Sequence, residues 1–338
     1  MKHISVVIPT KDRIDDLVNL INCLKKQTIP PSEVLIIDSS DNPVSIEELP
    51  ELSTIKLIRS EPSVCIQRNI GIRQSKGDYI LLCDDDVEFA EYYIEQLLDH
   101  LQMNKNVVAV TGLWYQKDEK EHWDYCYPPR SVSEVLKSWL FGLSIWGPVD
   151  EINPPMILKP IYYYLRNFYN DRSNFITKAG WPVYHDFKNK IIRTKVTSLG
   201  SALIRSEDLK KALYDEVLDP YGYGDNYDVC AKLTMQGQEI NVIKSLIVKH
   251  YQSSQNRAAL LLARYRRILA LAYFVKMKKH FNTSFSFFIW SLTGLLLASA
   301  VTLNLSLFAI YLKAYVKVIF NRNPYVTGSK NGEKVIKP

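Results

Sequence analysis

The chain has 338 residues, of which 47% are hydrophobic and 23% charged, with a formal net charge of +6. This length and composition predict one large domain, or a domain with appendages, around a substantial core, and they exclude a repeat or low-complexity protein. The charge is unevenly placed: residues 240–338 hold fifteen Lys or Arg and a single acid, Glu333, a net charge of +14, which leaves −8 for residues 1–239. An acidic body is therefore joined to a basic, aromatic-rich C-terminal region.

The cysteines and the first residues predict a cytoplasmic body. The five cysteines show no metal-ligand spacing and mostly lie in apolar patterns, which is typical of reduced core thiols. The opening Met1-Lys2-His3 leads at once into a strand-like segment, without the pattern of a secretory signal.

Short apolar runs alternate with helical patterns over the first third of the chain. Strands are predicted at residues 4–8, 34–37, 56–58, 80–83 and 107–110. Apolar residues at helical spacing predict helices between them, and their approximate ranges are residues 15–27, 64–76 and 90–103. This alternation predicts a parallel α/β sheet with right-handed crossovers.

The predicted strand at residues 80–83 leads directly into three carboxylates, Asp84, Asp85 and Asp86. Ligands bind at the carboxyl ends of the strands in an open parallel sheet, so this turn lies at the ligand edge. Three carboxylates in one turn repel one another unless a cation or hydrogen-bond donors compensate. A divalent ion that also holds a diphosphate is the predicted compensation. The alternative is a solvated acidic turn that caps the following helix.

The periodic pattern is lost between residues 113 and 196, where tryptophans and tyrosines are spread among prolines. Such aromatic side chains fill a second core lobe, stack on sugar rings or face a lipid. Residues 198–204 then predict a strand, with small residues where the backbone must approach another group closely. A helix follows near Glu207, and residues 221–233 pass from a glycine-rich loop through acids into a helix.

Six motifs follow one another along the chain: VVIPTKDR, EVLIIDSSD, CIQRNIGIRQSKGDYILLCDDD, LGSALIRSEDL, YGYGDNYDVCAKL and IVKHY. In this order they resemble the motifs of the inverting family-2 glycosyltransferases, which have the GT-A fold. The resemblance implies a GT-A domain at residues 1–255, in which residues 113–196 form an irregular insertion on the acceptor side. A basic and apolar helical region at residues 256–338 follows it.

The resemblance implies a binding site for a nucleoside-diphosphate sugar. Thr10, Asp12 and Arg13 would line the nucleotide entrance, and Asp38 would accept hydrogen bonds from the base. The alternative for Asp38 is a turn cap. Arg68 would hold the donor, and the alternative is that it forms only a surface ion pair. Asn69 would orient that loop. Asp84 on the ribose side and Asp85 complete the implied donor-binding residues.

The resemblance also implies a metal ion, Mn²⁺ or Mg²⁺. Asp86 would be its main ligand, with Asp84 beside it and His250 completing the shell. The alternative for His250 is a strand-end histidine without a ligand. The bound ion would neutralise the diphosphate leaving group as a Lewis acid.

The acidic loop departs from the family pattern. The family usually has Gly-Glu-Asp-x-Asp, whereas residues 224–228 read Gly-Asp-Asn-Tyr-Asp, which places Asn226 where the base is expected. An amide cannot accept the proton of the attacking hydroxyl as a base. Asp225 is therefore the predicted base, with Asp228 in support. The alternative is a catalytically weakened protein that binds sugar nucleotides as a scaffold subunit.

The predicted function is that of a hexosyl- or deoxyhexosyltransferase that moves a sugar, with inversion, to a polysaccharide or lipid-linked acceptor. Such enzymes build bacterial surface polysaccharides. Nucleotidyl transfer is disfavoured because no glycine-rich loop with a phosphate-binding lysine lies near the first strand. Nucleic-acid binding is disfavoured because a long apolar run interrupts the basic region.

The C-terminal region predicts attachment to the cytoplasmic face of the cell membrane. Between Arg257 and Lys279, basic and apolar residues alternate at helical spacing, which favours a helix lying in the membrane interface. Residues 281–312 carry no charge, a length that could span a bilayer of about 30 Å. A span or hairpin, an amphipathic pair lying flat, and a buried helical subdomain remain open.

Overall fold

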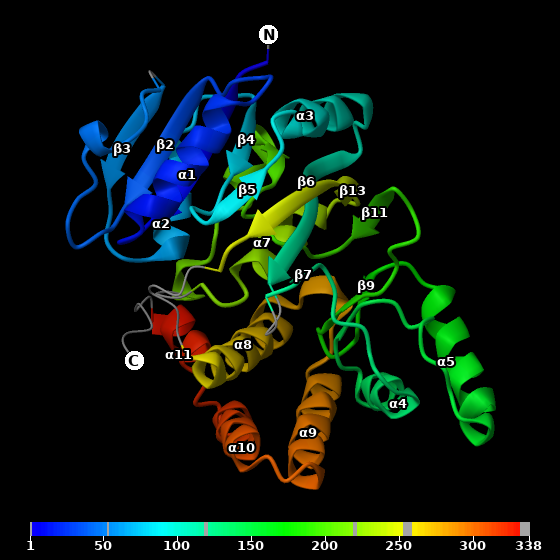
Figure 1. Ribbon diagram of the computed structural model, residues 1–338. Helices are drawn as coiled ribbons and strands as arrows, with labels where there is room; N and C mark the ends of the chain where they lie inside the picture. The colour runs from blue at the N-terminus through cyan, green and yellow to red at the C-terminus, as the bar shows by residue number, and fades with distance from the viewer. Residues whose placement is uncertain (1, 53, 118–120, 219–221, 253–258, 332–338) are drawn as a thin grey trace. The chain divides into compact units, whose positions relative to one another are not determined.

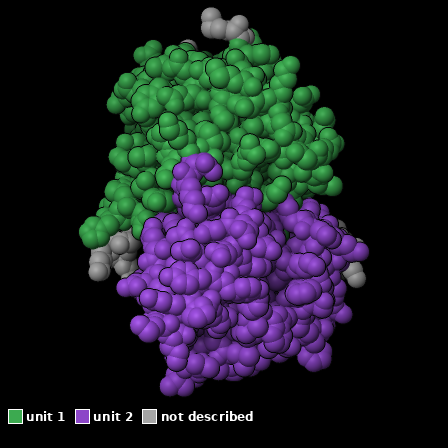
Figure 2. Space-filling model, turned by 90° about the vertical axis from the view of Figure 1, so that its right-hand side faces the viewer, with its two compact units in different colours: residues 1–125, 190–257 green, residues 126–189, 258–338 purple. Residues whose placement is uncertain are grey.

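The structure is a computed structural model that describes residues 2–52, 54–117, 121–218, 222–252 and 259–331. It divides into unit 1, residues 1–125 and 190–257, and unit 2, residues 126–189 and 258–338, coloured green and purple in Figure 2. The predicted domain boundary at residue 255, Arg257 and Tyr221 of the glycine-rich loop lie outside the described residues.

Unit 1 is built on one mixed sheet, shown in Figure 1. Its strands are β1 (Ile4–Thr10), β2 (Glu33–Asp38), β3 (Ile55–Arg59), β4 (Tyr79–Leu82), β5 (Val87–Phe89), β6 (Val107–Lys117), β7 (Trp123–Asp124), β11 (Ile191–Thr194), β12 (Leu203–Arg205) and β13 (Glu239–His250). The order is β11-β13-β6-β12-β4-β1-β2-β3, with β5 on β13 and β7 on β6. Strands β3, β2, β1 and β4 are parallel, whereas β12 is antiparallel to β4 and β6. The predicted parallel α/β sheet is confirmed in its larger part, with antiparallel strands added.

Helices flank this sheet as the sequence predicts. They are α1 (Ile14–Lys25), α2 (Val64–Gln74), α3 (Tyr93–Met103), α6 (Ser206–Lys211) and α7 (Asp225–Thr234). All residues of β1 and β2 are buried, as expected for strands covered on both faces. The β1–β2 and β3–β4 connections run in opposite directions across the sheet, so right-handed crossovers place α1 and α2 on opposite faces.

Helix α2 brings polar side chains into the interior. Ser63 caps its N-terminus, because the hydroxyl accepts a hydrogen bond of 3.1 Å from the Ile66 amide. Gly71 lies directly on Val7 of β1, where a Cβ atom would overlap the valine side chain. This close contact holds α2 against the sheet and buries Gln67, Arg68 and Asn69.

Unit 2 contains the segment in which the sequence predicted little regular structure. Its elements are α4 (Val132–Phe141), β8 (Ile145–Trp146), α5 (Lys159–Asn170), β9 (Phe175–Ile176), β10 (Pro182–Tyr184), α8 (Leu260–Tyr273), α9 (Phe285–Val301), α10 (Leu305–Ile319) and α11 (Pro324–Asn331). Strands β8, β10 and β9 form a separate small sheet. Val135, Leu165, Tyr169 and Val183 belong to a core between these elements, so part of the aromatic segment forms a second core.

The C-terminal helices divide the apolar residues of this stretch. Ile268, Leu269 and Phe274 are at most 2% exposed, and α8 packs against α10 and α11, whereas Leu260 at the start of α8 is 69% exposed. Part of the stretch therefore forms the interior of unit 2, and attachment to a membrane stays a prediction. Helix α9 packs against α10 as a hairpin (Figure 1). No helix within the described ranges has both the length and the apolar character needed to cross a bilayer.

Candidate active site

The carboxyl ends of β1, β2 and β4 meet at one edge of the sheet. Thr10 pairs with Asp38 at the ends of β1 and β2, and Val7 pairs with Leu82 beside them. The three-aspartate turn follows β4 directly. Residues from three separate motifs thus lie at the edge where parallel sheets bind ligands.

Asp85 is the buried centre of this edge. Its carboxylate accepts hydrogen bonds from the Thr10 hydroxyl at 2.8 Å and from the Arg13 guanidinium at 3.0 Å. Burial raises the pKa of Asp85 to about 7, although the charge of Arg13 opposes this shift. Asp85 therefore joins the loops after β1 and β4 from the inside.

Asp86 contacts His250 at the end of β13. The distance from Asp86 Oδ1 to His250 Nε2 is 3.2 Å, and the Gln116 amide lies 3.0 Å from His250 Nδ1. The Gln116 amide thus holds the imidazole through Nδ1 and leaves Nε2 directed at the carboxylate. Trp114 packs edge-on against the imidazole ring, with centroids 4.9 Å apart. Two side chains that suit divalent metals are thus held together by partners of their own.

Arg68 connects the three-aspartate turn to the acidic loop. Its guanidinium lies 2.6 Å from Asp84 and also forms an ion pair with Asp225, and its carbon lies 5.1 Å from the centre of the Tyr214 ring. Arg68 is only 6% exposed, and the carboxylates and Tyr214 raise its pKa well above the ordinary value against the effect of burial. A buried arginine thereby joins two motifs that are far apart in the sequence.

Gly200 makes room for this arrangement. The Asp84 amide donates to the Gly200 carbonyl at 2.8 Å, and a Cβ atom at position 200 would overlap the Asp84 carboxylate. The run of small residues at 198–202 was the sequence signal for such a close approach.

The two aspartates of the acidic loop, Asp225 and Asp228, have different surroundings. Gly222 and Gly224 have φ values of +61° and +88°, left-handed conformations that favour glycine, and α7 begins at Asp225. Burial raises the pKa of Asp225 to about 6, while Arg68 lowers it. Asp228 is 0% exposed and forms an ion pair with Lys232 at 2.5 Å. Arg68 forms a cluster with Asp84, Asp225 and Tyr214, here called the Arg68 cluster. Of the two aspartates of this loop, Asp225 belongs to this cluster and Asp228 does not.

Asp12 and Asp38 hold the backbone of the loops around them. Asp38 accepts hydrogen bonds from the Ser40 and Val44 amides at 2.8 and 3.0 Å and forms an ion pair with Arg59. Burial alone would raise the pKa of Asp38, and these donors bring it below its ordinary value. Asp12, at φ +54°, accepts from the Asp41 amide at 2.7 Å. Base recognition by Asp38 stays a prediction.

Asn69 holds a segment that sequence reasoning missed. Its amide nitrogen donates to the Tyr214 carbonyl at 3.0 Å, and its oxygen accepts from the Tyr214 amide at 2.8 Å. This clamp places the Tyr214 ring against Arg68. Neither Tyr214 nor Gln116 lies in a motif, so no sequence signal distinguished them.

The described residues contain no group of three or more His, Cys, Asp or Glu side chains arranged to hold a metal ion. The chemistry of Asp86 and His250 suits two ligands of such an ion, whereas the Asp84 carboxylate faces Arg68. A pocket of about 620 Å³ borders Asp85, Asp86, Glu88 and Tyr251, a size within the range of small-ligand sites.

This edge, with its buried arginine and its carboxylates, defines a GT-A-like α/β protein with a candidate nucleotide-sugar site. The family model described as "Glycosyl transferase family 2" matches residues 5–176, more than half of the chain. The chain belongs to this family.

Two relatives agree with this assignment. A Bacillus subtilis (strain 168) protein named "Uncharacterized glycosyltransferase YwdF" is 36% identical over 103 residues, 29% of this chain and 38% of that protein. An Escherichia coli chondroitin synthase is 31% identical over 155 residues, 44% of this chain and 23% of that protein. The chain thus spans less than half the length of these relatives.

The fold resembles that of a solved mannosyltransferase, PcManGT from Pyrobaculum calidifontis, in complex with GDP-Man and Mn²⁺. The TM-score is 0.52 at 13% identity, over 95% of this chain and 88% of that one. This likeness concerns the fold alone.

Proposed function

We propose that the chain is a glycosyltransferase that moves a sugar from a nucleoside-diphosphate sugar to a hydroxyl of a polysaccharide or lipid-linked acceptor. The observation that carries the proposal is the Arg68 cluster, which joins Asp84 at the strand edge to Asp225 at the start of α7. The buried guanidinium of Arg68 thus contacts both a residue of the proposed donor site, Asp84, and the candidate base, Asp225.

Asp86 and His250 are the residues that would hold a divalent ion together with the donor diphosphate. When bound, that ion supplies Lewis-acid stabilisation of the leaving diphosphate. Gln116 orients His250 through Nδ1, and Arg13, which lies 3.8 Å from Asp86, fixes the carboxylate from the other side. Mn²⁺ and Mg²⁺ both suit this mixed set of ligands.

Asp225 is the proposed general base. It takes the proton of the acceptor hydroxyl while that oxygen attacks the anomeric carbon and the bond to the diphosphate breaks. A single displacement inverts the anomeric centre. Its membership of the Arg68 cluster favours Asp225, whereas the fully buried Asp228 with its Lys232 partner is suited to stabilising α7.

The test is a screen of UDP-, GDP- and dTDP-linked sugars for hydrolysis or transfer by the full chain with Mn²⁺ or Mg²⁺. We expect turnover of at least one donor, lost in excess chelator. Turnover that persists in chelator would remove the metal from the proposal. If the chain binds a nucleotide sugar but turns over none of the donors tested, the proposed transferase activity is contradicted. That result would favour the scaffold subunit that Asn226 suggests.

We also propose that unit 2 attaches to the surface of an anionic membrane through the loop between α9 and α10. Val301, Leu303 and Leu305 are 83%, 82% and 78% exposed, and Leu303 has a φ of +52°. An apolar side chain is costly in water at such a turn but favourable in lipid. Unit 2 holds nineteen Lys or Arg and six acids, a net charge of +13, which favours an anionic surface.

Sedimentation with phosphatidylglycerol vesicles tests this attachment. Leu303→Asp should weaken binding about tenfold, because it places a charge in the lipid boundary. Met103→Asp is the matched control, since Met103 is 81% exposed but belongs to α3 of unit 1. Equal effects of the two substitutions, or no binding by the unaltered chain, would contradict the proposal.

A further inference from the structure

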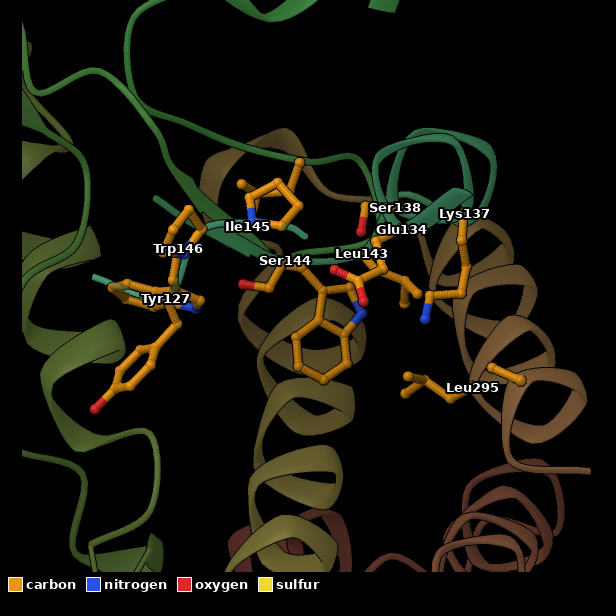
Figure 3. Close-up of a pocket in the computed structure, with 13 residues that line it drawn as sticks. Tyr127, Glu134, Lys137, Ser138, Leu143, Ser144, Ile145, Trp146 and Leu295 are labelled. Carbon is orange, nitrogen blue, oxygen red and sulfur yellow. The ribbon is translucent and has the colours of Figure 1, made fainter. Parts of the chain in front are cut away.

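Unit 2 contains a pocket whose lining residues all belong to that unit. Its volume is about 360 Å³, within the range of small-ligand sites. Tyr127, Trp146 and Trp181 supply aromatic walls, and α4 supplies Glu134, Lys137 and Ser138. Figure 3 shows Tyr127 and Trp146 gathered at one end of the pocket and the α4 side chains at the other, with Leu295 of α9 below.

The aromatic walls are held in place by their neighbours. The Trp181 indole nitrogen donates to the Ser291 hydroxyl at 2.7 Å. Trp146 stacks on Tyr184 with ring centroids 5.8 Å apart and an interplanar angle of 24°, yet it remains 44% exposed. Tyr127 is 58% exposed. The two tryptophan rings therefore need little ordering before a ligand binds, which favours affinity.

The polar side chains of α4 include two without partners. In the part of the chain that the structure describes, neither the Lys137 ammonium nor the Ser138 hydroxyl has a hydrogen-bond or ion-pair partner. Ser138 is only 9% exposed, and Lys137 is half-buried. Figure 3 shows the Lys137 amine turned from α4 toward the space bordered by Leu295. Both side chains line the pocket, where a ligand with hydroxyl groups would give them hydrogen-bond partners.

The charges of the lining select the kind of ligand. Glu134 and Lys137 place one acid and one base a single turn apart on α4. Donor and acceptor side by side suit neighbouring hydroxyl groups, and a lining with no net charge gives no preference for a phosphate head group. Aromatic rings offer a flat apolar surface to the C–H face of a pyranose.

We propose that this pocket binds an uncharged pyranose unit of the glycan chain that the protein extends. The identity of the glycan as acceptor rests on the proposed function, whereas the binding of sugar by the pocket does not. The aromatic-rich segment that links α4, β8 and β10 then has a second task besides forming a core.

The test measures binding of tetrasaccharides of glucose, galactose, mannose and N-acetylglucosamine to the full chain by calorimetry and saturation-transfer NMR. We expect at least one to bind with a Kd of about 1 mM or tighter. Trp146→Ala should weaken it about tenfold, and Lys137→Met about fivefold.

A tyrosine pair supplies the matched control. Tyr127 and Tyr164 are both 58% exposed and both belong to unit 2, but only Tyr127 lines the pocket. Tyr127→Ala should weaken binding several-fold, and Tyr164→Ala should leave it unchanged. The proposal is overturned if no tetrasaccharide binds, if Trp146→Ala binds as well as the unaltered chain, or if both tyrosine variants weaken binding equally.

Donor hydrolysis separates this proposal from the proposed function. Trp146→Ala should hydrolyse a nucleotide sugar at the unaltered rate, because the pocket does not belong to the donor site. If the chain binds the sugar but hydrolyses no donor, the pocket stands and the transferase falls. If it hydrolyses a donor but binds no tetrasaccharide, the transferase stands and the pocket proposal falls.

Discussion

The two units of the chain place their polar groups in opposite ways. Unit 1 carries a net charge of −7 and buries charged side chains, such as Asp85 and Arg68, in partnered clusters at its strand ends. Unit 2 carries +13 and leaves apolar side chains such as Leu303 and Trp146 exposed. In the functions proposed above, the partnered charges of unit 1 serve the chemistry, and the exposed apolar groups of unit 2 bind other molecules.

The two units also differ in how they position the residues of their candidate sites. In unit 1, pairs far apart in sequence meet because neighbouring parallel strands end at one edge, and Asn69 and Gly200 hold them in register. In unit 2, the pocket is lined by α4, by Leu295 and Ala298 of α9, and by aromatic rings. Substitutions in unit 1 should therefore affect turnover, and those in unit 2 should affect affinity for glycan or membrane.

The largest effect is expected at Asp86. Asp86→Ala removes the carboxylate that contacts His250, and turnover should fall about 10⁴-fold, which corresponds to roughly 5.5 kcal/mol. Steady-state rates at saturating Mn²⁺ measure this. Asp99→Ala, which removes an exposed acid on α3, is the control and should keep full activity. A loss below about tenfold for Asp86→Ala would contradict a role in metal binding.

The next effect compares two aspartates of α7. Asp225→Asn should lower kcat about 10³-fold while donor affinity changes little, because a general base acts only in the transition state. Asp228→Asn should mainly reduce stability, since Asp228 is buried against Lys232. If Asp228→Asn is the inactive variant and Asp225→Asn is not, the two roles are exchanged.

The third effect is a pH dependence in unit 1. Burial raises the pKa of Asp225 to about 6, and a base must be ionised, so kcat/KM should fall about tenfold per pH unit below pH 6 and level off above it. The residual activity of Asp225→Asn should lack this limb. A limb near pH 7 that persists in that variant would belong to Asp85 instead.

The ionisation of Asp225 should affect the free energy of unfolding with the opposite sign. Its contribution to stability falls as the pH rises, whereas kcat/KM increases. The native carboxyl keeps its proton up to about pH 6, whereas the unfolded one loses it near the ordinary aspartate pKa of 3.8. The folded state therefore binds more protons between these values, and its contribution to stability is lost as the pH rises from about 4 to 6. Urea unfolding of Asp225→Asn should lack this slope.

Most of unit 1 could be predicted from the sequence because its signals are local. β-branched runs marked β1 and β2, and apolar residues at helical spacing marked α1 and α2. The lengths of strands β12 and β13 were harder to predict from the sequence, because β12 has only three residues whereas β13 has twelve. Their pairing depends on residues more than a hundred positions away.

Unit 2 gave weaker signals for a physical reason. Its two segments are separated by residues 190–257, so α4 packs against α9, a helix that no local pattern connects to it. The uncharged stretch from 281 to 312 suggested a membrane span, but Leu303 turns the chain and divides it into α9 and α10. Likewise, motifs predicted Arg68 but could not show that it joins Asp84 to Asp225.

The smallest effect compares one helix cap in each unit. Ser63 caps α2 and Ser131 caps α4, with hydroxyls 3.1 and 3.3 Å from the amides of Ile66 and Glu134. Replacing either serine by alanine should cost about 1 kcal/mol of unfolding free energy, because one amide at the helix start loses its acceptor. Urea unfolding gives the magnitude, and hydrogen exchange shows which helix loses protection.

The two caps should also separate the functions of the units. Ser63→Ala loosens the first turn of the helix that carries Arg68, so it should lower donor turnover a few-fold and leave tetrasaccharide binding unchanged. Ser131→Ala loosens the helix that carries Lys137 and Ser138, so it should weaken tetrasaccharide binding and leave donor hydrolysis unchanged. Loss of protection in both helices from either substitution would show that the units unfold together, and the division of tasks between them would then lack a basis in local stability.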